Sequence, residues 1–322
     1  MEQNPRPSLE DFRGDYGALA SMMQRSWAQN QENPLLYTEE FLRSAFEYPG
    51  TRRHLSPTLY SNETPVGFIA GFPRRVLWRG QALSIALNTF LTAAPGVKGR
   101  GYGLALWSEF CRRAKREGLD GTIGFCAEGE EMNGCVLECS RVFGYCTSRI
   151  LTIPYMARLI RPGAEAAPAD RDTGIFLEAA SAVSLPEGIA RIWSSQEAEW
   201  QCLGREGAIY AAHTAGSRRG ALTGYVMRIA DAERTSCVIM DDILWGTLEG
   251  EERAQLLQKF LQQAGQAGAK LAVAPQMGYS DLGPLVKAGF RRTRRLMHAY
   301  LTLWGPGHPA PEPVTGAYID VF

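Results

Sequence analysis

The sequence has no excess of either charge and no long apolar run, and each absence excludes a class of protein. Its 34 Lys and Arg residues balance 34 Asp and Glu residues, so the formal net charge is zero. A broad nucleic-acid-binding surface needs an excess of basic residues, so no nucleic acid is expected as a partner. No segment approaches the roughly 20 apolar residues of a membrane span, and the polar stretch from Met1 to Arg13 lacks the apolar core of a signal peptide. We therefore expect a cytoplasmic protein without a membrane span.

The cysteines and histidines are too dispersed to form a structural metal site. The seven cysteines are an odd number, none lies in a CxxC pair, and the four histidines are scattered along the chain. A disulfide framework usually has an even set of cysteines at characteristic spacings. We therefore expect reduced, partly buried cysteines and no bound metal.

The order of predicted elements in the first half indicates an α/β chain. Apolar residues recur at helical spacing over 15–27 and again from Thr38 to Phe46, where Thr38 and Glu40 suit a helix N-terminus. Three segments rich in β-branched and aromatic residues, at 56–61, 65–79 and 82–94, predict antiparallel strands. The remaining predictions for this half are a helix at 101–117, a strand at 122–127, a helix at 133–143 and a strand at 145–160.

The same order partly repeats in the second half of the chain. The predicted elements are a helix at 188–204, strands at 207–213, 220–229 and 235–245, a helix at 251–263, a strand at 270–275, a short helix ending at Lys287 and a strand at 294–304. This repeat predicts a first domain over 1–162, an Ala- and Pro-rich linker over 163–171 and a second domain over 172–305. A tail over 306–322 ends in the apolar string Tyr318–Phe322, which we expect to dock on the rest of the protein.

The segment from Lys98 to Gly103, which reads KGRGYG, is suited to binding an anion. It follows a predicted strand and opens a predicted helix. Its three glycines let successive backbone N–H groups converge without interference from Cβ atoms. The helix N-terminus adds unpaired N–H donors and the positive end of the helix dipole, and Lys98 and Arg100 add positive charge. The combination predicts a site for a group such as a diphosphate.

Two common phosphate loops and a plain tight turn are the alternative interpretations of this segment. A dinucleotide-binding turn reads GxGxxG, whereas the spacing here is GxGxG and the preceding strands read as antiparallel. A Walker A loop closes with GK[ST], which the segment lacks. A glycine run that merely connects a strand to a helix is the third alternative.

The segment resembles the acyl-CoA-binding loop of GNAT acyltransferases, which reads [Q/R]-x-x-G-x-[G/A] between the fourth strand and the third helix. Lys98 stands where Gln or Arg is usual, the glycines fit, and Pro95 matches a proline that commonly precedes the motif. The order of elements over residues 1–160 is also similar to that of the family. The resemblance implies an α/β (α+β) fold with two tandem GNAT-like domains, each a mixed, mostly antiparallel sheet flanked by helices.

The resemblance also implies where acetyl-CoA or another acyl-CoA binds as co-substrate. Family members bind the pantetheine arm on main-chain groups of the fourth strand and the pyrophosphate on backbone N–H groups of the loop. The thioester lies where the fourth and fifth strands separate, and an Asn that opens the next helix often contacts the cofactor. The corresponding residues here are Leu91, Thr92 and Ala93 on the strand, Lys98, Gly99, Arg100, Gly101, Tyr102, Gly103 and Leu104 at the loop, and Asn133.

The chemistry implied by the resemblance is direct attack of an amine on the thioester. It needs an oxyanion donor, which in the family is usually a fourth-strand backbone N–H, and an acid for the leaving thiolate. The family's tyrosine acid falls at Ser140, which is a poorer donor that would act directly or hold a water. A serine bonded to its own helix backbone is one alternative, and unassisted departure of the thiolate is another.

An acidic cluster follows the predicted fifth strand and supplies candidates for the base. Glu128, Glu130 and Glu131 lie near where the acyl group and the acceptor should meet, and Glu128, nearest the strand end, is the first candidate. A solvated acidic loop is the alternative. The nearby cysteines have no histidine close in sequence to activate a thiol, so core packing is the better interpretation for them.

The second half lacks an equivalent loop. Its counterpart, Leu244 to Glu251, is acidic and without the glycine spacing, so it would repel a diphosphate. We expect a degenerate GNAT-like domain that does not bind CoA in the usual way. The basic run from Arg291 to Arg295 either binds an anionic acceptor or carrier protein, or lies on an exposed strand face.

The sequence therefore leaves three functions open. The first is an acyl-CoA-dependent N-acyltransferase that moves an acetyl or longer acyl group to an amine of a small molecule or peptide. The second is acyl transfer from an acyl carrier protein or to a hydroxyl, and the third is an inactive CoA-binding sensor. The complete glycine loop favours an enzyme, whereas Ser140 keeps the sensor open.

Overall fold

The first half of the chain folds into the helices and longer strands expected from its sequence, together with two short strands, 8–11 and 35–36, that were not predicted. A computed structural model describes residues 6–27, 35–129, 132–161, 169–230, 235–304 and 310–321, with only the backbone for 132–135 and 139. The strands of this half are β1 (Ser8–Asp11), β2 (Leu35–Leu36), β3 (Pro57–Ser61), β4 (Thr64–Trp78), β5 (Gln81–Ala93), β6 (Gly121–Ala127) and β7 (Cys146–Leu159). The helices are α1 (Tyr16–Trp27), α2 (Glu39–Phe46), α3 (Tyr102–Arg116) and α4 (Met132–Val142). The predicted N-terminus of α2 is confirmed, because the Thr38 hydroxyl accepts the N–H of Phe41 at 3.2 Å.

The second half repeats much of this order, and two of its helices have only five residues. Its strands are β8 (Ile189–Ile192), β9 (Ala208–Ala215), β10 (Arg218–Ile229), β11 (Ser236–Leu244), β12 (Leu271–Pro275), β13 (Arg291–Leu303) and β14 (Ala317–Tyr318). The helices are α5 (Thr173–Ser181), α6 (Ser195–Glu199), α7 (Gly250–Gln266) and α8 (Gly283–Lys287). Among the described residues, no helix has the length and apolar character needed to cross a bilayer.

The predicted helix over 188–204 is wrong in its first part. Residues 189–192 form β8, which pairs antiparallel with β4 from Arg75 to Trp78. Helix α6 begins only after Ser194, whose hydroxyl caps it, and continues into a π-helical turn over 200–204. Pairing with a strand more than a hundred residues away is not encoded in local periodicity, which explains the error.

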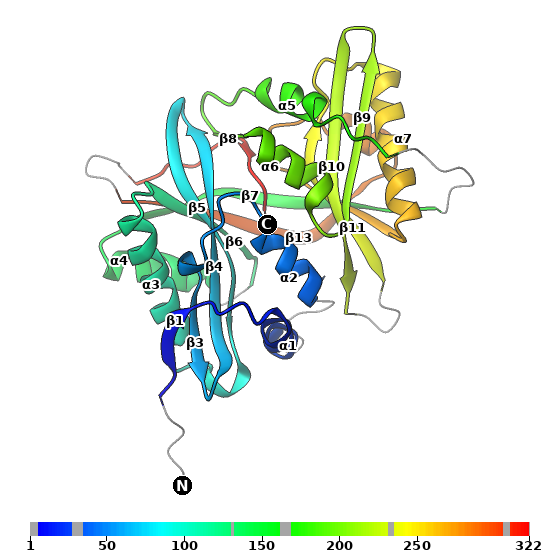
Figure 1. The fold of residues 1–322 in the computed structure, drawn as a ribbon. Coiled ribbons are helices and arrows are strands. Elements are labelled where there is room, and N and C mark those ends of the chain that lie inside the picture. Colours follow the sequence, from blue (N-terminus) through cyan, green and yellow to red (C-terminus); the bar gives the residue numbers. More distant parts are fainter. Residues whose placement is uncertain are drawn as a thin grey trace.

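A single sheet of fourteen strands joins the two halves (Figure 1). Its main path runs β1-β3-β4-β5-β6-β13-β7-β12-β11-β10-β2. Strand β13, from the end of the second half, lies between β6 and β7 of the first and is antiparallel to both. Strand β7 in turn pairs with β12. Each half therefore contains a strand supplied by the other, and β7 and β13 cross the middle of the molecule together (Figure 1). The domain limits at 162 and 172 stay a prediction.

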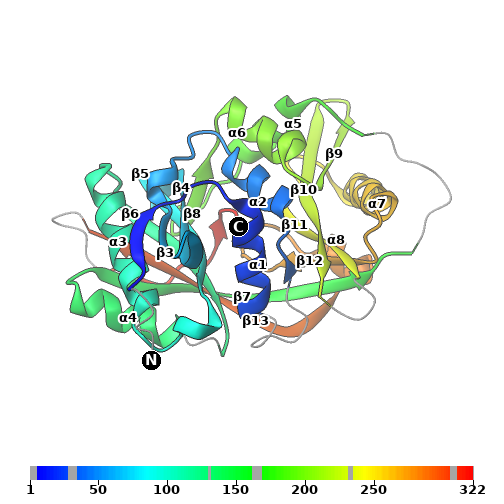
Figure 2. The ribbon, with the colours of Figure 1, turned by 60° about the horizontal axis from the view of Figure 1, so that its bottom comes forward.

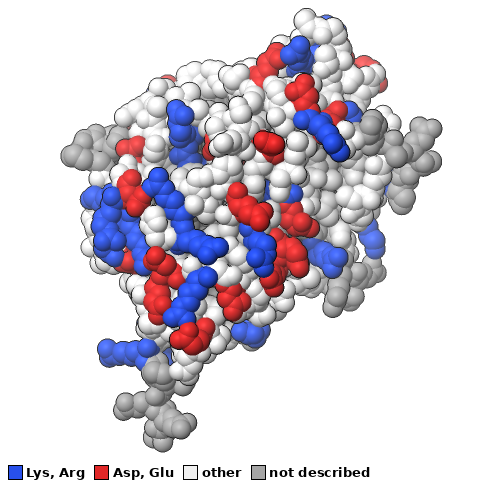
Figure 3. Space-filling view, in the orientation of Figure 1, with Lys and Arg blue, Asp and Glu red and all other residues white. Residues whose placement is uncertain are grey.

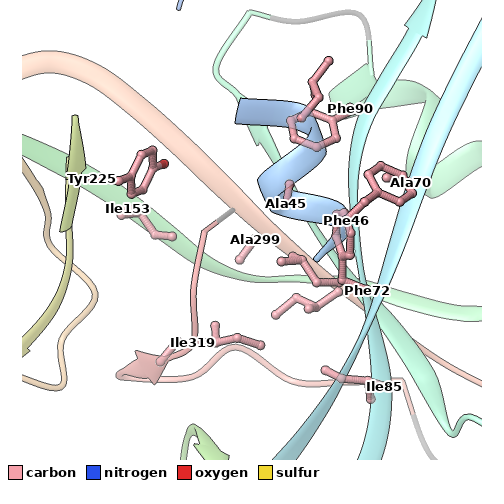
Figure 4. Packing of buried hydrophobic residues seen from close by; sticks show 14 of the residues in the cluster. Ala45, Phe46, Ala70, Phe72, Ile85, Phe90, Ile153, Tyr225, Ala299 and Ile319 are labelled. Carbon is pink, nitrogen blue, oxygen red and sulfur yellow. The ribbon is translucent and has the colours of Figure 1, made fainter. Parts of the chain in front are cut away.

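The helices of the first half cover both faces of its part of the sheet (Figure 2). Residues of α1 and α2 pack with Phe68 and Phe72 of β4 in the largest hydrophobic cluster. Helix α3 packs on the other face, where Trp107 and Phe110 contact Ile69. The large cluster continues into β10, β13 and the C-terminal tail, and Figure 4 shows residues from these elements gathered around α2. The two halves thus share one core.

The C-terminal string docks as expected, over its described residues up to Val321. Strand β14 pairs in parallel with β8, and Ile319 lies in the shared core. Asp320 is buried and accepts from Arg74 at 2.6 Å and pairs with Arg191 at 2.6 Å. Burial would raise the pKa of the Asp320 carboxyl, but Arg191 and Arg74 outweigh it and hold that pKa below its usual range. The tail is therefore fixed by a buried ionic contact. Phe322 lies outside the described residues.

Replacing Asp320 by Asn should destabilise the protein strongly. The substitution leaves two buried guanidinium groups without their counter-ion, a change that costs about 3–5 kcal/mol. Glu312→Gln is the matched control in the same tail, because Glu312 forms an exposed pair with Arg79 at 2.9 Å and should change stability by less than about 1 kcal/mol. Urea unfolding of the three proteins measures both values.

The same comparison has a pH dependence. Since the pKa of Asp320 is lower in the folded than in the unfolded protein, its contribution is complete above the unfolded value and is lost as the pH falls through the folded one. The gap between wild type and Asp320→Asn should therefore shrink below about pH 4. A gap that is independent of pH would contradict the assigned role of the ionised carboxylate.

Candidate functional site

Strands β5 and β6 run parallel and then separate. Their pairing covers four positions and ends at Asn88 with Gly124. Strand β5 continues to Ala93 along β4, and β6 continues to Ala127 along β13. A fork therefore opens between the two strands beyond Asn88 and Gly124, at their C-terminal ends.

A β-bulge in β5 lies where this strand turns away from β6. The register of β5 against β4 shifts between Phe68 and Ala70, where two residues of β5 oppose one of β4. Phe90 lies in this bulge with φ of 60°, a conformation that a bulky residue rarely adopts. Its ring is buried and packs edge-on against Tyr37 at 5.3 Å between centroids. Packing therefore holds a backbone conformation that redirects the strand.

The vertex of the fork is occupied by an asparagine side chain. The Asn88 amide donates to the Thr122 hydroxyl at 2.8 Å, and Thr122 donates to the Ala86 carbonyl at 2.8 Å. A Cβ atom at position 124 would lie 2.3 Å from the Asn88 side-chain oxygen. Gly124 thus leaves the space in which Asn88 fixes the point of separation.

The predicted glycine loop leads from β5 to α3. A short 3-10 turn, Pro95–Val97, is followed by Gly99 at φ 74° and Gly101 at φ 77°, which are left-handed conformations that favour glycine. Gly101 is the N-cap of α3, and no side chain caps this helix. Helices α2, α5 and α6 each receive a side-chain cap. The N-terminus of α3 therefore has N–H donors without a side-chain cap, beside the exposed residues Lys98 and Arg100.

The three predicted strand residues lie beyond the vertex of the fork. Leu91 packs partly against the α3 face. Thr92 is buried, and its hydroxyl finds no hydrogen-bond partner in the described part of the chain. The Ala93 carbonyl already accepts from the Ser26 hydroxyl at 2.7 Å. Among these groups, the Thr92 hydroxyl is a buried polar atom that a ligand would satisfy.

The predicted catalytic residues have different surroundings. Glu128 is exposed at the end of β6, where its backbone N–H donates to the Leu296 carbonyl at 3.0 Å. Ser140 is buried, donates to the Val136 carbonyl at 2.6 Å and accepts from Thr147 at 2.7 Å. This is the backbone-bonded arrangement considered as the alternative for Ser140. Their catalytic roles stay predictions.

Three other sequence predictions fall partly or wholly outside the described residues. Asn133 lies in the first turn of α4, but its side chain is not described. Glu130 and Glu131 lie outside the described residues altogether. In the described part of the chain, no group of three His, Cys, Asp or Glu side chains is arranged to hold a metal.

A small cavity adjoins the vertex, and sequence reasoning missed most of its lining. It is lined by Asn88, Trp107, Gly124, Cys126, Val136, Tyr300 and Thr302. Tyr300 and Thr302 come from β13, the strand supplied by the second half. No local motif marks these two residues, because their place depends on the pairing of β13 with β6.

The equivalent gap in the second half is filled by a side chain. Strands β11 and β12 pair in parallel as far as Ile239 and Val273. Beyond that point the Tyr279 hydroxyl accepts the N–H of Ile243 at 2.8 Å and donates to the Asp241 carbonyl at 3.3 Å. Tyr279 therefore satisfies strand groups that a ligand would use in an open fork.

The second half also differs from the first in the acidic groups at its closed strand gap and at the start of α7. Asp241 and Asp242 are buried beside Tyr279, and burial raises the pKa of Asp241 to about 6 although Arg205 lies 2.5 Å away. The Glu252 carboxylate accepts the Glu249 N–H at 3.1 Å at the start of α7. The helix terminus that corresponds to the glycine loop is thus already capped by an acid, as its acidic sequence suggested.

Solved structures of two kinds of acyltransferase have a similar architecture. N-myristoyltransferase of Saccharomyces cerevisiae with bound myristoyl-CoA and inhibitors matches with a TM-score of 0.73 at 11% identity, over 98% of this chain and 84% of that one. A second structure of the yeast enzyme, with bound myristoyl-CoA, matches with a TM-score of 0.72 at 12% identity, over 98% and 82%. The chain has the GNAT fold.

Another solved structure matches less closely. The GCN5-related N-acetyltransferase from Kribbella flavida has a TM-score of 0.53 at 14% identity, over 93% of this chain and 71% of that one. No model of a known protein family and no curated protein matches the sequence. The predicted fold class, a mixed and mostly antiparallel sheet flanked by helices in the GNAT arrangement, is confirmed.

A double-mutant cycle tests the vertex of the fork. Gly124→Ala should displace the Asn88 side chain and break its hydrogen bond to Thr122, at a cost of about 1–2 kcal/mol. In an Asn88→Ala background the added methyl has room, so the same substitution should cost about 1 kcal/mol less. Urea unfolding of the four proteins gives the coupling energy. Strict additivity would show that Asn88 does not occupy the space beside Gly124.

Proposed function

We propose that the protein is an acyl-CoA-dependent N-acyltransferase that moves an acetyl or longer acyl group from CoA to an amine. The observation that carries the proposal is the junction of an open strand fork with an uncapped helix N-terminus. The fork offers strand edges to an extended arm, and the helix N-terminus offers N–H donors to a diphosphate. CoA has both of these parts, an extended arm and a diphosphate, in one molecule.

The residues present fit the co-substrate. We propose that the pantetheine arm lies along Leu91, Thr92 and Ala93, and that the buried Thr92 hydroxyl completes a hydrogen bond when the arm is bound. The pyrophosphate would lie on the N–H groups from Gly99 to Leu104. No atom lies within 4 Å of a Cβ built on Gly99, Gly101 or Gly103, so the loop presents open backbone to the phosphates.

The reaction would be attack of a neutral amine on the thioester carbonyl. A backbone N–H of β5 beyond the bulge would stabilise the oxyanion. Glu128 stands exposed at the mouth of the fork, where it would accept a proton through water or attract a cationic acceptor. The acceptor in this proposal is the amine of a small molecule or peptide, and the setting is the cytoplasm.

The charge distribution supports a small or peptide acceptor rather than a polyanion. Lys and Arg side chains are interspersed with Asp and Glu over the face shown in Figure 3, in keeping with a formal net charge of zero. Transfer from an acyl carrier protein or to a hydroxyl, and CoA sensing without turnover, are the alternatives. No specific contact described above favours either of them.

The direct test of function is acyl transfer itself. Wild-type protein incubated with acetyl-CoA or longer acyl-CoAs and a panel of amines and peptides should release free CoA thiol only when an acceptor is present. The donor that gives the highest kcat/KM would define the acyl length. Tight CoA binding without turnover on any acceptor would contradict an enzyme and support the sensor.

The assignment of the loop has its own test. Gly101→Glu places a side chain and a negative charge at the predicted pyrophosphate site and should weaken CoA binding by about 100-fold or more, the equivalent of one or two lost charge-assisted hydrogen bonds. Isothermal titration with CoA measures this change.

The matched control is Gly216→Glu in the turn between β9 and β10. Gly216 has a left-handed φ of 62° and open space around its Cβ, as Gly101 does. Both variants should therefore carry similar backbone strain, but only Gly101→Glu should lose CoA. Unchanged affinity in Gly101→Glu would exclude the loop as the pyrophosphate site.

A further inference from the structure

The proposed reaction needs a proton for the departing thiolate, and the hydroxyl of Ser140, the donor predicted from the sequence, is engaged in other hydrogen bonds. The Ser140 hydroxyl donates its hydrogen to the Val136 carbonyl. It also accepts from Thr147, whose own hydroxyl lies 2.8 Å from that of Thr302. These hydroxyls connect α4 to β7 and β13 by hydrogen bonds. Removing the proton of Ser140 would therefore disrupt a buried hydrogen-bond network.

A tyrosine from the other half of the chain stands at the fork instead. Asn88, Gly124 and Tyr300 are register partners on three neighbouring strands, β5, β6 and β13. Partners in register point to the same face of a sheet, so Tyr300 shares the α3 face with Asn88. Both line the small cavity at the vertex, on either side of Gly124.

Gly124 lies between Asn88 and Tyr300 and has no side chain that would separate them. A residue with a side chain at position 124 would separate Asn88 from Tyr300, whose strands are two spacings or about 10 Å apart. With glycine there, the phenol borders the cavity together with Trp107 of α3 and Val136 of α4. The cavity thus lies between the vertex of the fork and the Tyr300 ring.

We propose that Tyr300 is the general acid that protonates the CoA thiolate. This inference rests on the proposed N-acyltransferase function. The amine nitrogen forms a bond to the carbonyl carbon, the carbon–sulfur bond breaks, and its electron pair leaves on sulfur. The sulfur takes the phenolic proton of Tyr300. The new amide loses its surplus proton to solvent, directly or through Glu128, and solvent returns a proton to the tyrosinate, so the net transfer is one proton from amine to thiol.

The electrostatic surroundings keep the phenol protonated before the reaction. Burial raises the pKa of Tyr300, Cys126 raises it further, and Arg149 lowers it. His298, two residues along β13, lies 3.0 Å from the Thr152 hydroxyl. Tyr300 therefore enters each cycle as a neutral acid at physiological pH. Its acidity is weaker than that of a free thiol, so proton transfer to sulfur is uphill by itself and is completed when solvent returns a proton to the tyrosinate.

Other groups around the cavity are less suited to this role. The Thr302 hydroxyl belongs to the contact with Thr147, and the Asn88 amide is engaged with Thr122. Cys126 is the remaining titratable group. If its thiol accepted the acyl group instead, the reaction would proceed through an acyl-enzyme, which the experiment below distinguishes.

Tyr300→Phe removes the proton and keeps the ring. The variant should lower kcat by about 100-fold, the lower end of the range for general acid catalysis, while KM for the acyl-CoA and the Kd for CoA stay within about threefold. Tyr145→Phe is the matched control, because Tyr145 packs against Trp107, which lines the cavity, and against Trp304, but does not itself line the cavity. It should keep wild-type kcat.

A fluorinated tyrosine at position 300 gives a second measurement, which would not change if Tyr300 had only a structural role. Its more acidic phenol should shift the alkaline limb of the kcat profile to lower pH, because the acid ionises earlier. An unmoved limb, or a kcat for Tyr300→Phe within twofold of wild type, would overturn the role of Tyr300 alone. Absence of turnover in the wild type would overturn the proposed function with it. A covalent acyl adduct on Cys126, detected by intact mass, would overturn direct transfer.

Discussion

The end of the β5–β6 ladder at Asn88 and Gly124 is the constraint on which the candidate site depends. Parallel strands normally satisfy each other's backbone groups along their whole length. Here a bulge at Phe90 turns β5 away, and an asparagine seated over a glycine fixes where the separation starts. The strand edges beyond that point and the uncapped start of α3 are polar backbone groups placed together. In the proposed function, an extended ligand that ends in phosphates would supply the partners that these groups need.

The exchange of β7 and β13 explains why the second half matters although its own fork is filled. Tyr279 and the acid-capped α7 leave that half without an anion site of the first kind. Yet β13 pairs with β6 on the edge away from the first fork and carries Tyr300 to the cavity at its vertex. The buried contact of Asp320 with Arg74 and Arg191 then fixes the C-terminal tail across both halves. The second half thus contributes a strand and a lining residue to the candidate site of the first half.

Local signals in the sequence were sufficient for most of the first half and for the glycine loop. The helix start at Thr38 and the glycines of the loop depend on residues close in sequence, and both lie where the pattern predicted. The partners of β8, β13 and Asp320 depend on contacts across more than a hundred residues, which no periodicity records. Because such long-range contacts leave no local signal, the sequence indicated Ser140 as a candidate for proton transfer but did not indicate Tyr300. The first occupies a motif position, whereas the second reaches the site only through strand exchange.

The measurement that tests the account most directly is amide hydrogen exchange with and without CoA. A ligand in the open fork would protect backbone N–H groups at 89–93 and 99–104, because those groups would become its hydrogen-bond donors or be covered by it. The corresponding stretch of the second half, 241–252, should exchange at the same rate in both samples. Protection confined to the second half, or absent from the loop after β5, would contradict the central claim that the fork between β5 and β6 binds CoA.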